Sequence, residues 1–452
     1  MSLHIVILAA GQGSRMKSDL PKVLHKIAGK PMLQHVVDTV SQLDAEGIHI
    51  IIGHGAEMVK DNIAGDVNWC YQEEQLGTGH AVAQALPSIP ADSQVLILYG
   101  DVPLISINTL SSLLNGSDED NIALLTVALE NPAGYGRIIR NFEGNIKAII
   151  EEKDASEEVK DITEVNTGIL ALTSNQLHKY IPLLGNNNAQ GEYYLTDLIA
   201  LANEFGNKIK AHHPQFEQEV QGVNNRLQLC ELECWYQSRM AEELMISGVT
   251  LYDPQRIDVR GSLNCGKDVE IDVNCIFIGE VELGSNVKIG ANCIIEDSRI
   301  GSNTTVFANT LIQDTEILES VSIGPFARLR PGTKLENNSK VGNFVETKKT
   351  VLGEGSKINH LSYVGDALIG KKVNVGAGTI TCNYDGVNKF KTEIADGVFV
   401  GSNTSLVAPV KIAENATIGA GSTINKEVEK EQLAIARAKQ KNINSWQRPT
   451  KK

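Results

Sequence analysis

From about residue 269 to residue 424, the chain places an aliphatic or small apolar residue at every sixth position. The two longest runs are Val269, Cys275, Val281, Val287 and Cys293, and Val400, Leu406, Ile412, Ile418 and Ile424. A period of six fits neither the turn of a helix, about 3.6 residues, nor the simple alternation of a strand. It is typical of a hexapeptide β-solenoid, in which very short strands stack coil upon coil. We therefore predict an all-β repeat domain, a parallel β-helix, in the C-terminal half.

Residues 1–226 follow a different pattern, in which apolar strand-like runs alternate with helical segments. The runs include HIVILAA, IHIIIG and QVLILYG, and helices are expected near 31–43 and 55–63. Strands that alternate with helices predict a mostly parallel sheet with helices on both faces, a Rossmann-like α/β domain. Further strands, some of them antiparallel at the sheet edge, are expected at 123–129, 136–140, 146–150 and 167–172.

A long helix is expected to join the two halves, because residues 226–247 keep helical spacing without a breaker until Gly248. The predicted domains are thus 1–226, a linker helix at 227–248, and the β-helix domain at 249–452. A polar insertion at 381–393 interrupts the repeats. The tail around 427–440 is expected to be helical, which would cover the unpaired strand edge of the last coil.

Composition narrows the possible partners and the cellular compartment. A formal net charge of -14 argues against binding to nucleic acid or to an anionic membrane, because phosphates would be repelled. No apolar stretch is long enough for a transmembrane helix, and the N-terminus lacks the basic start of a signal peptide. Seven cysteines without CxxC spacing predict free thiols in a reducing cytoplasm.

Candidate functional residues are most concentrated at 8–22, LAAGQGSRMKSDLPK, where a predicted strand leads into a glycine loop. Gly11 and Gly13 would let backbone amides approach a phosphate, and Arg15 and Lys22 would supply positive charge. The dinucleotide fingerprint GxGxxG is excluded because Met16 stands at its third glycine, and there is no GxxxxGK[ST] loop.

Asp101 is expected at the carboxyl edge of the sheet, because it follows the apolar strand QVLILYG. Open α/β sheets bind ligands at this edge, and a carboxylate there suits Mg²⁺, which keeps phosphates and waters as its other ligands. A strand-end aspartate that merely caps the next loop is the alternative.

LAAGQGSRM followed by PK resembles the signature of the sugar-1-phosphate nucleotidylyltransferases, with Ser14 where threonine is common. The segments QEEQLGTGHA, LYGDVPL, GYGRI, EVNTGI and GVNN agree with this resemblance. With the solenoid, nearly the whole chain resembles the bifunctional bacterial N-acetylglucosamine-1-phosphate uridylyltransferase / glucosamine-1-phosphate N-acetyltransferase family.

The resemblance implies a left-handed β-helix and two reactions. Acetyl-CoA would acetylate glucosamine-1-phosphate in the C-terminal domain. UMP would then pass from UTP to N-acetylglucosamine-1-phosphate in the N-terminal domain, giving UDP-N-acetylglucosamine and pyrophosphate for peptidoglycan and lipopolysaccharide synthesis.

For the N-terminal site, the resemblance implies that the triphosphate is served by Arg15 and Lys22 and that Mg²⁺ is held by Asp101 and Asn224. UTP and UDP-N-acetylglucosamine would be bound by Leu8, Ala9, Ala10, Gly11, Lys22, Gln72, Gly77, Thr78, Tyr99, Gly100, Asp101, Gly136, Glu151, Asn166 and Asn224. Gly77 and Gly136 could equally be plain turn residues. The attacking phosphate is already an anion, so positioning and charge neutralisation suffice and no general base is required.

For the C-terminal site, polar residues depart from the repeat in one region, among them Arg328, Arg330, Lys348, His360 and Tyr363. An imidazole suits the removal of a proton from an amine as it attacks a thioester, so His360 is expected to be the general base. The resemblance implies Arg330, Lys348, Tyr363 and Asn374 for glucosamine-1-phosphate, and Ala377, Asn383, Tyr384, Ser402, Ala420 and Arg437 for acetyl-CoA. It also implies a homotrimer with sites shared between chains.

Two other interpretations compete with the bifunctional one. A monofunctional sugar nucleotidylyltransferase with a structural or regulatory solenoid would need no acetyl-CoA, and the polar residues around His360 speak against it. A non-catalytic protein with a degenerate nucleotide fold would be expected to lose its charges first, yet Arg15, Lys22 and Asp101 are all present.

Overall fold

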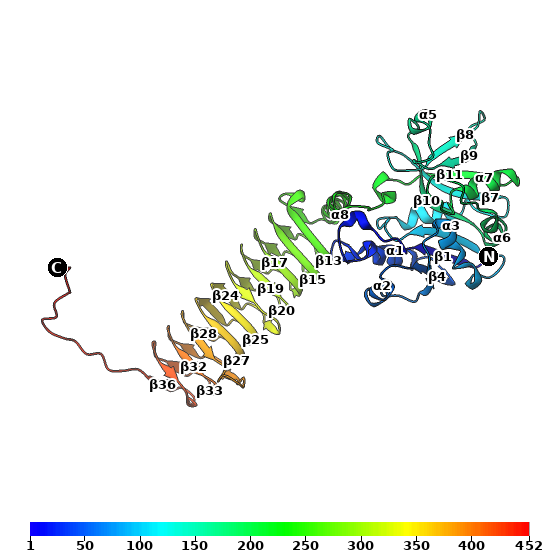
Figure 1. Ribbon diagram of the computed structural model, residues 1–452. Coiled ribbons are helices and arrows are strands. Elements are labelled where there is room, and N and C mark those ends of the chain that lie inside the picture. The colour runs from blue at the N-terminus through cyan, green and yellow to red at the C-terminus, as the bar shows by residue number, and fades with distance from the viewer. Residues whose placement is uncertain (452) are drawn as a thin grey trace. The chain divides into compact units, whose positions relative to one another are not determined.

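The computed structural model describes residues 1–451, which form two compact units. The first unit is Met1–Tyr236 and the second begins at Gln237. This boundary falls inside the long helix α8 (Arg226–Ile246), which ends two residues before Gly248 (Figure 1). The helix expected at this place is therefore confirmed. Among the described residues, no helix is long and apolar enough to cross a membrane.

The N-terminal unit is built on a nine-stranded sheet of order β11-β7-β10-β6-β1-β4-β5 with the hairpin β8–β9 attached. Its central strands β1 (Leu3–Leu8), β4 (Gly47–Ile52), β5 (Asn68–Tyr71) and β6 (Gln94–Tyr99) are parallel. The predicted antiparallel strands are β7 (Asn121–Ala128), β8 (Arg137–Arg140), β9 (Ile146–Ile150) and β10 (Glu164–Thr173), while β11 (Lys208–His212) pairs in parallel with β7. The predicted α/β architecture is thus confirmed.

Helices cover both faces of this sheet because its strands are apolar on both sides. Ile5 and Ile7 of β1 point into one core, and Val6 and Leu8 into the other. The first core also receives α1 (Met32–Val40), α2 (Ala56–Asn62) and α4 (Ile107–Leu114). The second receives α3 (Thr78–Ala83), α6 (Ser174–Tyr180) and α7 (Asp197–Glu204). Burial on both faces leaves the carboxyl ends of the strands as the open edge.

The second unit is the predicted β-helix, from β12 (Thr250–Leu251) to β36 (Leu433–Ala434). Its strands pair in parallel in two long sheets, of eleven and fourteen strands (Figure 1). The sixth-position residues fill its core, where Val281, Leu335 and Leu406 are fully buried. Many corners need a left-handed backbone, which asparagine tolerates better than most residues, as at Asn274 and Asn286.

The helix expected around 427–440 is wrong. Residues there form β36, which pairs in parallel with β34 (Thr417–Ile418). Thr417 N donates to Gln432 O at 2.8 Å, and Gly419 N donates to Ala434 O at 2.9 Å. A further strand offers carbonyl groups in the plane of the sheet to the amides of the preceding coil. The carbonyls of a helix form hydrogen bonds along the helix axis, so a helix placed across this end would leave those amides without partners.

Candidate functional sites

The glycine loop after β1 depends on a close approach between two segments. Gly13 has φ +63°, and a Cβ added there would lie 2.5 Å from Cβ of Lys22. Any other residue at this position would therefore push the Lys22 segment away from the loop. The loop thus brings the predicted triphosphate lysine next to the end of β1.

A cavity of about 550 Å³ opens beside this loop at the carboxyl ends of β1 and β6. Its walls bring together predicted nucleotide residues from distant parts of the chain, namely Leu8, Ala9, Ala10, Gly11, Lys22, Gln72, Gly77, Thr78, Tyr99 and Asp101. The sequence pattern does not single out its other lining residues, Gln12, Val23, Gln75, Ala81 and Glu192. Gln75 lies inside the QEEQLGTGHA segment, and its side chain accepts a hydrogen bond from Gln12 Nε2 at 3.3 Å.

Charged and amide groups converge at the edge of this cavity. The Lys22 ammonium pairs with Asp101 Oδ2 and lies 3.2 Å from Asn224 Oδ1. Arg15 Nη2 donates to the same Asn224 oxygen at 2.8 Å. All four residues predicted for the triphosphate and the metal ion therefore lie together, although Asn224 is 202 positions from Lys22.

The oxygen donors of this cluster have the chemistry that a hard cation prefers. Asp101 offers a carboxylate and Asn224 an amide oxygen, and both already face the ammonium of Lys22. Among residues 1–451, no group of three or more His, Cys, Asp or Glu side chains is arranged to hold a metal ion. A divalent ion here would thus draw its remaining ligands from phosphate and water, as Mg²⁺ commonly does.

Three of the residues predicted for UDP-N-acetylglucosamine, Gly136, Glu151 and Asn166, meet at the hairpin β8–β9, whereas Asn224 lies with Arg15 and Lys22. Asn166 N donates to Gly136 O at 2.8 Å, and a Cβ on Gly136 would lie 3.3 Å from Glu151 Oε1. Glu151 accepts a hydrogen bond from Thr196 Oγ1 at 3.0 Å. Burial raises the pKa of Glu151 above its usual range, and nearby carboxylates add to this effect. The carboxyl group is therefore held in a poorly hydrated place, where it can form hydrogen bonds with sugar hydroxyls.

A buried arginine, which the sequence pattern does not single out, supports this hairpin. Arg137 is 2% exposed, and its Nη1 lies 2.8 Å from Glu152 Oε2, an ion pair whose angles are not those of a hydrogen bond. Its Nε and Nη2 donate to Lys160 O at 3.3 and 3.2 Å, and its Nη1 donates to Tyr135 O. A charged residue at an apolar strand position, inside the GYGRI segment, is the signal that marks it.

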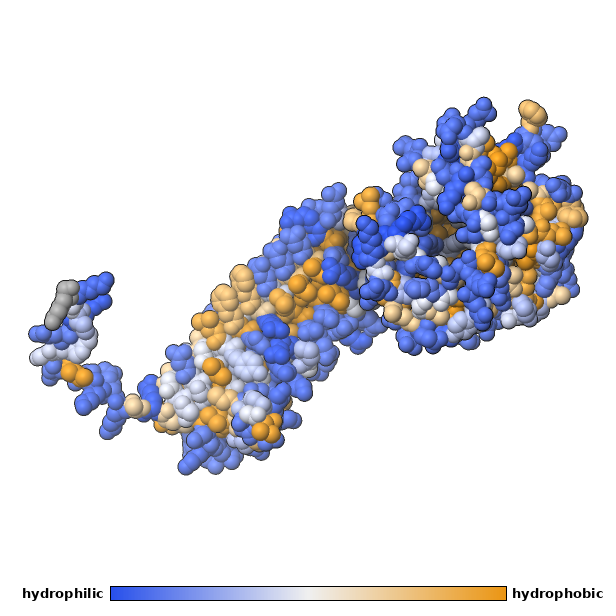
Figure 2. Space-filling view, in the orientation of Figure 1, coloured by the Kyte–Doolittle hydropathy of each residue, from blue (hydrophilic) through white to orange (hydrophobic). Residues whose placement is uncertain are grey.

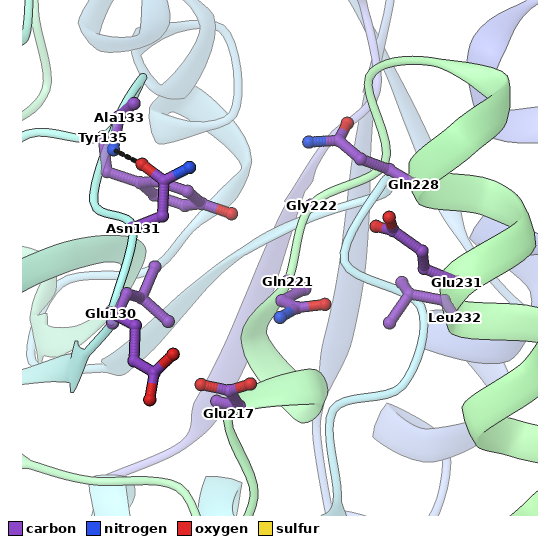
Figure 3. A pocket seen from close by; sticks show the side chains of 11 residues that line it. Glu130, Asn131, Ala133, Tyr135, Glu217, Gln221, Gly222, Gln228, Glu231 and Leu232 are labelled. Atoms are coloured by element: carbon purple, nitrogen blue, oxygen red, sulfur yellow. Dashed lines mark hydrogen bonds between the residues drawn. The ribbon is translucent and has the colours of Figure 1, made fainter.

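A second cavity, of about 490 Å³, lies between the 129–135 loop and the first turns of α8 (Figure 3). Three carboxylates line it, those of Glu130, Glu217 and Glu231, and no lysine or arginine does. An anionic triphosphate would be repelled there. Charge therefore makes the cavity that contains Lys22 the better candidate for a nucleotide.

In the β-helix, several predicted residues occupy one corner row, with one residue in each successive coil. The row consists of Asn343, His360, Ala377, Ser402 and Ala420, each of which precedes a residue with positive φ. Hydrogen bonds link these coils, from Leu361 N to Asn343 O, Gly378 N to His360 O, Asn403 N to Ala377 O and Gly421 N to Ser402 O. Arg437 Nη1 donates to Ala420 O at 2.7 Å at the end of the row. The structure thus aligns His360 with four of the residues predicted for acetyl-CoA.

The predicted phosphate-binding cations lie on neighbouring coils. Arg330 Nη1 pairs with Glu346 Oε1 at 2.8 Å. The pKa of Lys348 is lowered by the nearby charges of Lys389 and then Arg330, so three cations share one region. Lys389, in the insertion, is absent from the predicted set, because nothing in the repeat pattern relates it to Lys348.

The other predicted C-terminal residues divide between two places. Tyr363 pairs with Glu346 in the same sheet as Lys348, whereas Asn374 lies in the other sheet, between Lys357 and Phe399. In the insertion, Asn383 Nδ2 donates to Asp366 Oδ2 at 2.5 Å, and Tyr384 OH donates to Gly386 O at 2.5 Å.

Comparison with known proteins agrees with this two-part organisation. Residues 5–155 match the MobA-like NTP transferase domain, and residues 391–426 match the bacterial transferase hexapeptide (six repeats). The chain is 62% identical over 450 residues to a protein of Marinobacter nauticus named "Bifunctional protein GlmU", covering 99% of each chain. Proteins of the same name from Saccharophagus degradans and Legionella pneumophila are 58% and 56% identical, covering all of this chain and 100% and 99% of their own lengths.

Proposed function

The chain belongs to the family of the bifunctional GlmU proteins, and from this we propose which of its residues carry the two reactions. The protein is a bifunctional enzyme, a glucosamine-1-phosphate N-acetyltransferase and an N-acetylglucosamine-1-phosphate uridylyltransferase. It acts on small molecules, and its nucleotidyltransferase reaction uses a nucleotide and a metal ion. The monofunctional and non-catalytic interpretations are therefore excluded.

In the N-terminal unit, we assign uridylyl transfer to the cavity beside Gly11 and Gly13. Lys22 and Arg15 neutralise the triphosphate of UTP, and Gly136, Glu151 and Asn166 hold the amino sugar. Asp101 and Asn224 would hold Mg²⁺, which when bound supplies charge neutralisation at the pyrophosphate. The phosphate of N-acetylglucosamine-1-phosphate attacks the α-phosphorus in line, and the bond to pyrophosphate breaks. The observation that carries this assignment is the convergence of Lys22, Asp101 and Asn224 at the strand ends.

In the β-helix, we assign acetyl transfer to the corner row. His360 removes a proton from the amine of glucosamine-1-phosphate as its nitrogen attacks the thioester carbonyl of acetyl-CoA, and CoA leaves as the thiol. Arg330 and Lys348, joined by Lys389, face the sugar phosphate, with Tyr363 and Asn374 completing its contacts. Acetyl-CoA runs along Ala377, Ser402, Ala420 and Arg437, with Asn383 and Tyr384 from the insertion.

Association of three chains is part of the proposal. Apolar surface is exposed along the β-helix (Figure 2). The large apolar side chains exposed there include Phe326, Phe344 and Leu361, at 50%, 55% and 62%. Phe326 and Phe344 stack with ring centroids 5.3 Å apart. Such a row of exposed apolar side chains on successive coils favours burial against another subunit. In the trimer that we propose, acetyl-transfer sites would be shared between chains.

The proposal is tested by omitting one reactant at a time from a mixture of glucosamine-1-phosphate, acetyl-CoA, UTP and Mg²⁺. CoA release is expected without UTP, and pyrophosphate release is expected only after acetylation. Lys22→Ala should lower uridylyl transfer by about 10²-fold or more and spare acetyl transfer, whereas His360→Ala should do the reverse. Equal loss of both activities in either variant would contradict two independent sites.

A further inference from the structure

Asn343 stands next to His360 in the corner row, one coil before it. The strands β24 (Lys340–Asn343) and β26 (Lys357–His360) are paired in parallel with these two residues opposite each other. Their side chains also meet, because His360 Nδ1 lies 2.5 Å from Asn343 Oδ1. The residues proposed for acetyl-CoA lie on the other flank, beginning with Ala377. Asn343 therefore holds the imidazole from the side away from the thioester donor.

This contact selects one form of the imidazole. An amide oxygen only accepts hydrogen bonds, so Nδ1 of His360 must carry the proton in this contact. In the neutral ring, Nε2 is then left with the lone pair that a general base needs. We propose that Asn343 is a positioning residue for acetyl transfer, which fixes the tautomer and orientation of the His360 ring. The proposal rests on the assignment of His360 as the general base.

The backbone does not require asparagine at position 343. Elsewhere in the β-helix, asparagines pair from coil to coil, as in Asn286 Nδ2 to Asn303 Oδ1 at 3.1 Å, and both of these residues have positive φ. At the coil of Asn343, the residue with positive φ is the next one, Phe344. The side chain of Asn343 thus serves neither an asparagine ladder nor a strained corner, and its partner is the ring of His360.

Four variants of the full-length protein test this role, by acetyl-transfer kinetics from pH 5.5 to 9 and by thermal unfolding. Asn343→Ala should lower kcat by about 10- to 100-fold and leave both KM values within about twofold, because binding groups are untouched while the base is less well placed. Asn343→Asp keeps an acceptor and should recover most of kcat. Its carboxylate stabilises the imidazolium, so the acidic limb of the kcat/KM profile should move to higher pH.

Asn286→Gly is the matched structural control, because it removes a coil-to-coil side-chain hydrogen bond far from the row while glycine accepts the positive φ. It should keep full acetyl transfer. His360→Ala distinguishes the general-base role of His360 from the positioning role of Asn343. If His360→Ala is active, the proposed function of His360 fails. If it is inactive but Asn343→Ala behaves as wild type, or Asn343→Asp leaves the pH profile unmoved, the positioning role of Asn343 alone is overturned.

Discussion

Two arginines in the short strand β8 offer a direct test of how the sugar hairpin is supported. Arg137 is 2% exposed and Arg140 is 34% exposed by side chain, yet each pairs with one glutamate, at 2.8 and 2.7 Å. Replacing Arg137 with methionine keeps an apolar stem but leaves Glu152, Tyr135 O and Lys160 O without their cation or donor. Breaking a buried pair in this way costs about 3–5 kcal/mol.

Because Glu152 is partly exposed, the expected loss in the free energy of unfolding lies at the lower end of this range. The Glu152 side chain is 32% exposed, so water recovers part of the lost solvation, and we expect a loss of about 3 kcal/mol for Arg137→Met. The pair of Arg140 and Glu164 is half-buried, and Arg140 donates to both carboxylate oxygens, at 2.8 and 2.7 Å, so it should contribute about 1 kcal/mol, the upper end of the range for pairs at the surface. The two variants should therefore differ by about 2 kcal/mol, a factor of about 30 in the unfolding equilibrium constant.

Urea unfolding followed by tryptophan fluorescence measures this difference, because Trp69 lies in β5 of the same unit. The hairpin carries Gly136 and Glu151, so Arg137→Met should also raise KM for N-acetylglucosamine-1-phosphate in the native protein, while acetyl transfer stays unchanged. Equal destabilisation by Arg137→Met and Arg140→Met, or an unchanged KM, would refute the view that the buried guanidinium holds the sugar site in shape.

Three further outcomes follow from other contacts. Burial lowers the pKa of His4 and of His49 from the usual 6.5. Their contribution to stability should be complete above about pH 6.5 and be lost as pH falls through the lower folded-state values, and urea midpoints of a double His→Asn variant should lose much of this dependence. Gly168 has φ +82° and its Cβ would lie 2.4 Å from the Tyr99 ring, so Gly168→Ala should cost about 2–5 kcal/mol, which a near-wild-type urea midpoint would disprove. The Lys22 ammonium contacts the oxygens of Asp101 and Asn224 that are proposed to hold the metal ion. Lys22→Met should therefore tighten Mn²⁺ binding to nucleotide-free protein by about tenfold in an electron-paramagnetic-resonance titration. Equal affinity in the variant and the wild type would argue against this metal site.

Local patterns were sufficient to predict the architecture and the place of Asp101 at the strand ends. The six-residue period located the β-helix because each coil repeats the same burial at the same interval. The strand before Asp101 placed that carboxylate at the ligand-binding edge because parallel strands all end on one side. Both features arise from interactions close in sequence or repeated along it.

Contacts between distant segments were beyond such patterns. Arg137 reads as a polar interruption in a strand, and only the fold shows the carbonyls and the carboxylate that surround it. Lys389 joins Lys348 across an insertion that has no repeat of its own. A helix in the tail is predicted because it would cover the unpaired strand edge of the last coil, but that edge offers hydrogen bonds that a further strand satisfies better.

The residues of the corner row are spaced along the β-helix by whole coils. Asn343, His360 and Ala377 follow one another at steps of 17 residues, and the step to Ser402 is 25 because it includes the insertion. A whole coil added or removed before Asn343 would change the length of the rod and leave the spacing between the base and its neighbours intact. Loss of a coil between His360 and Ala420 would remove residues that we propose to contact acetyl-CoA. Tolerance to length change should thus be high in the first coils and disappear where the row begins.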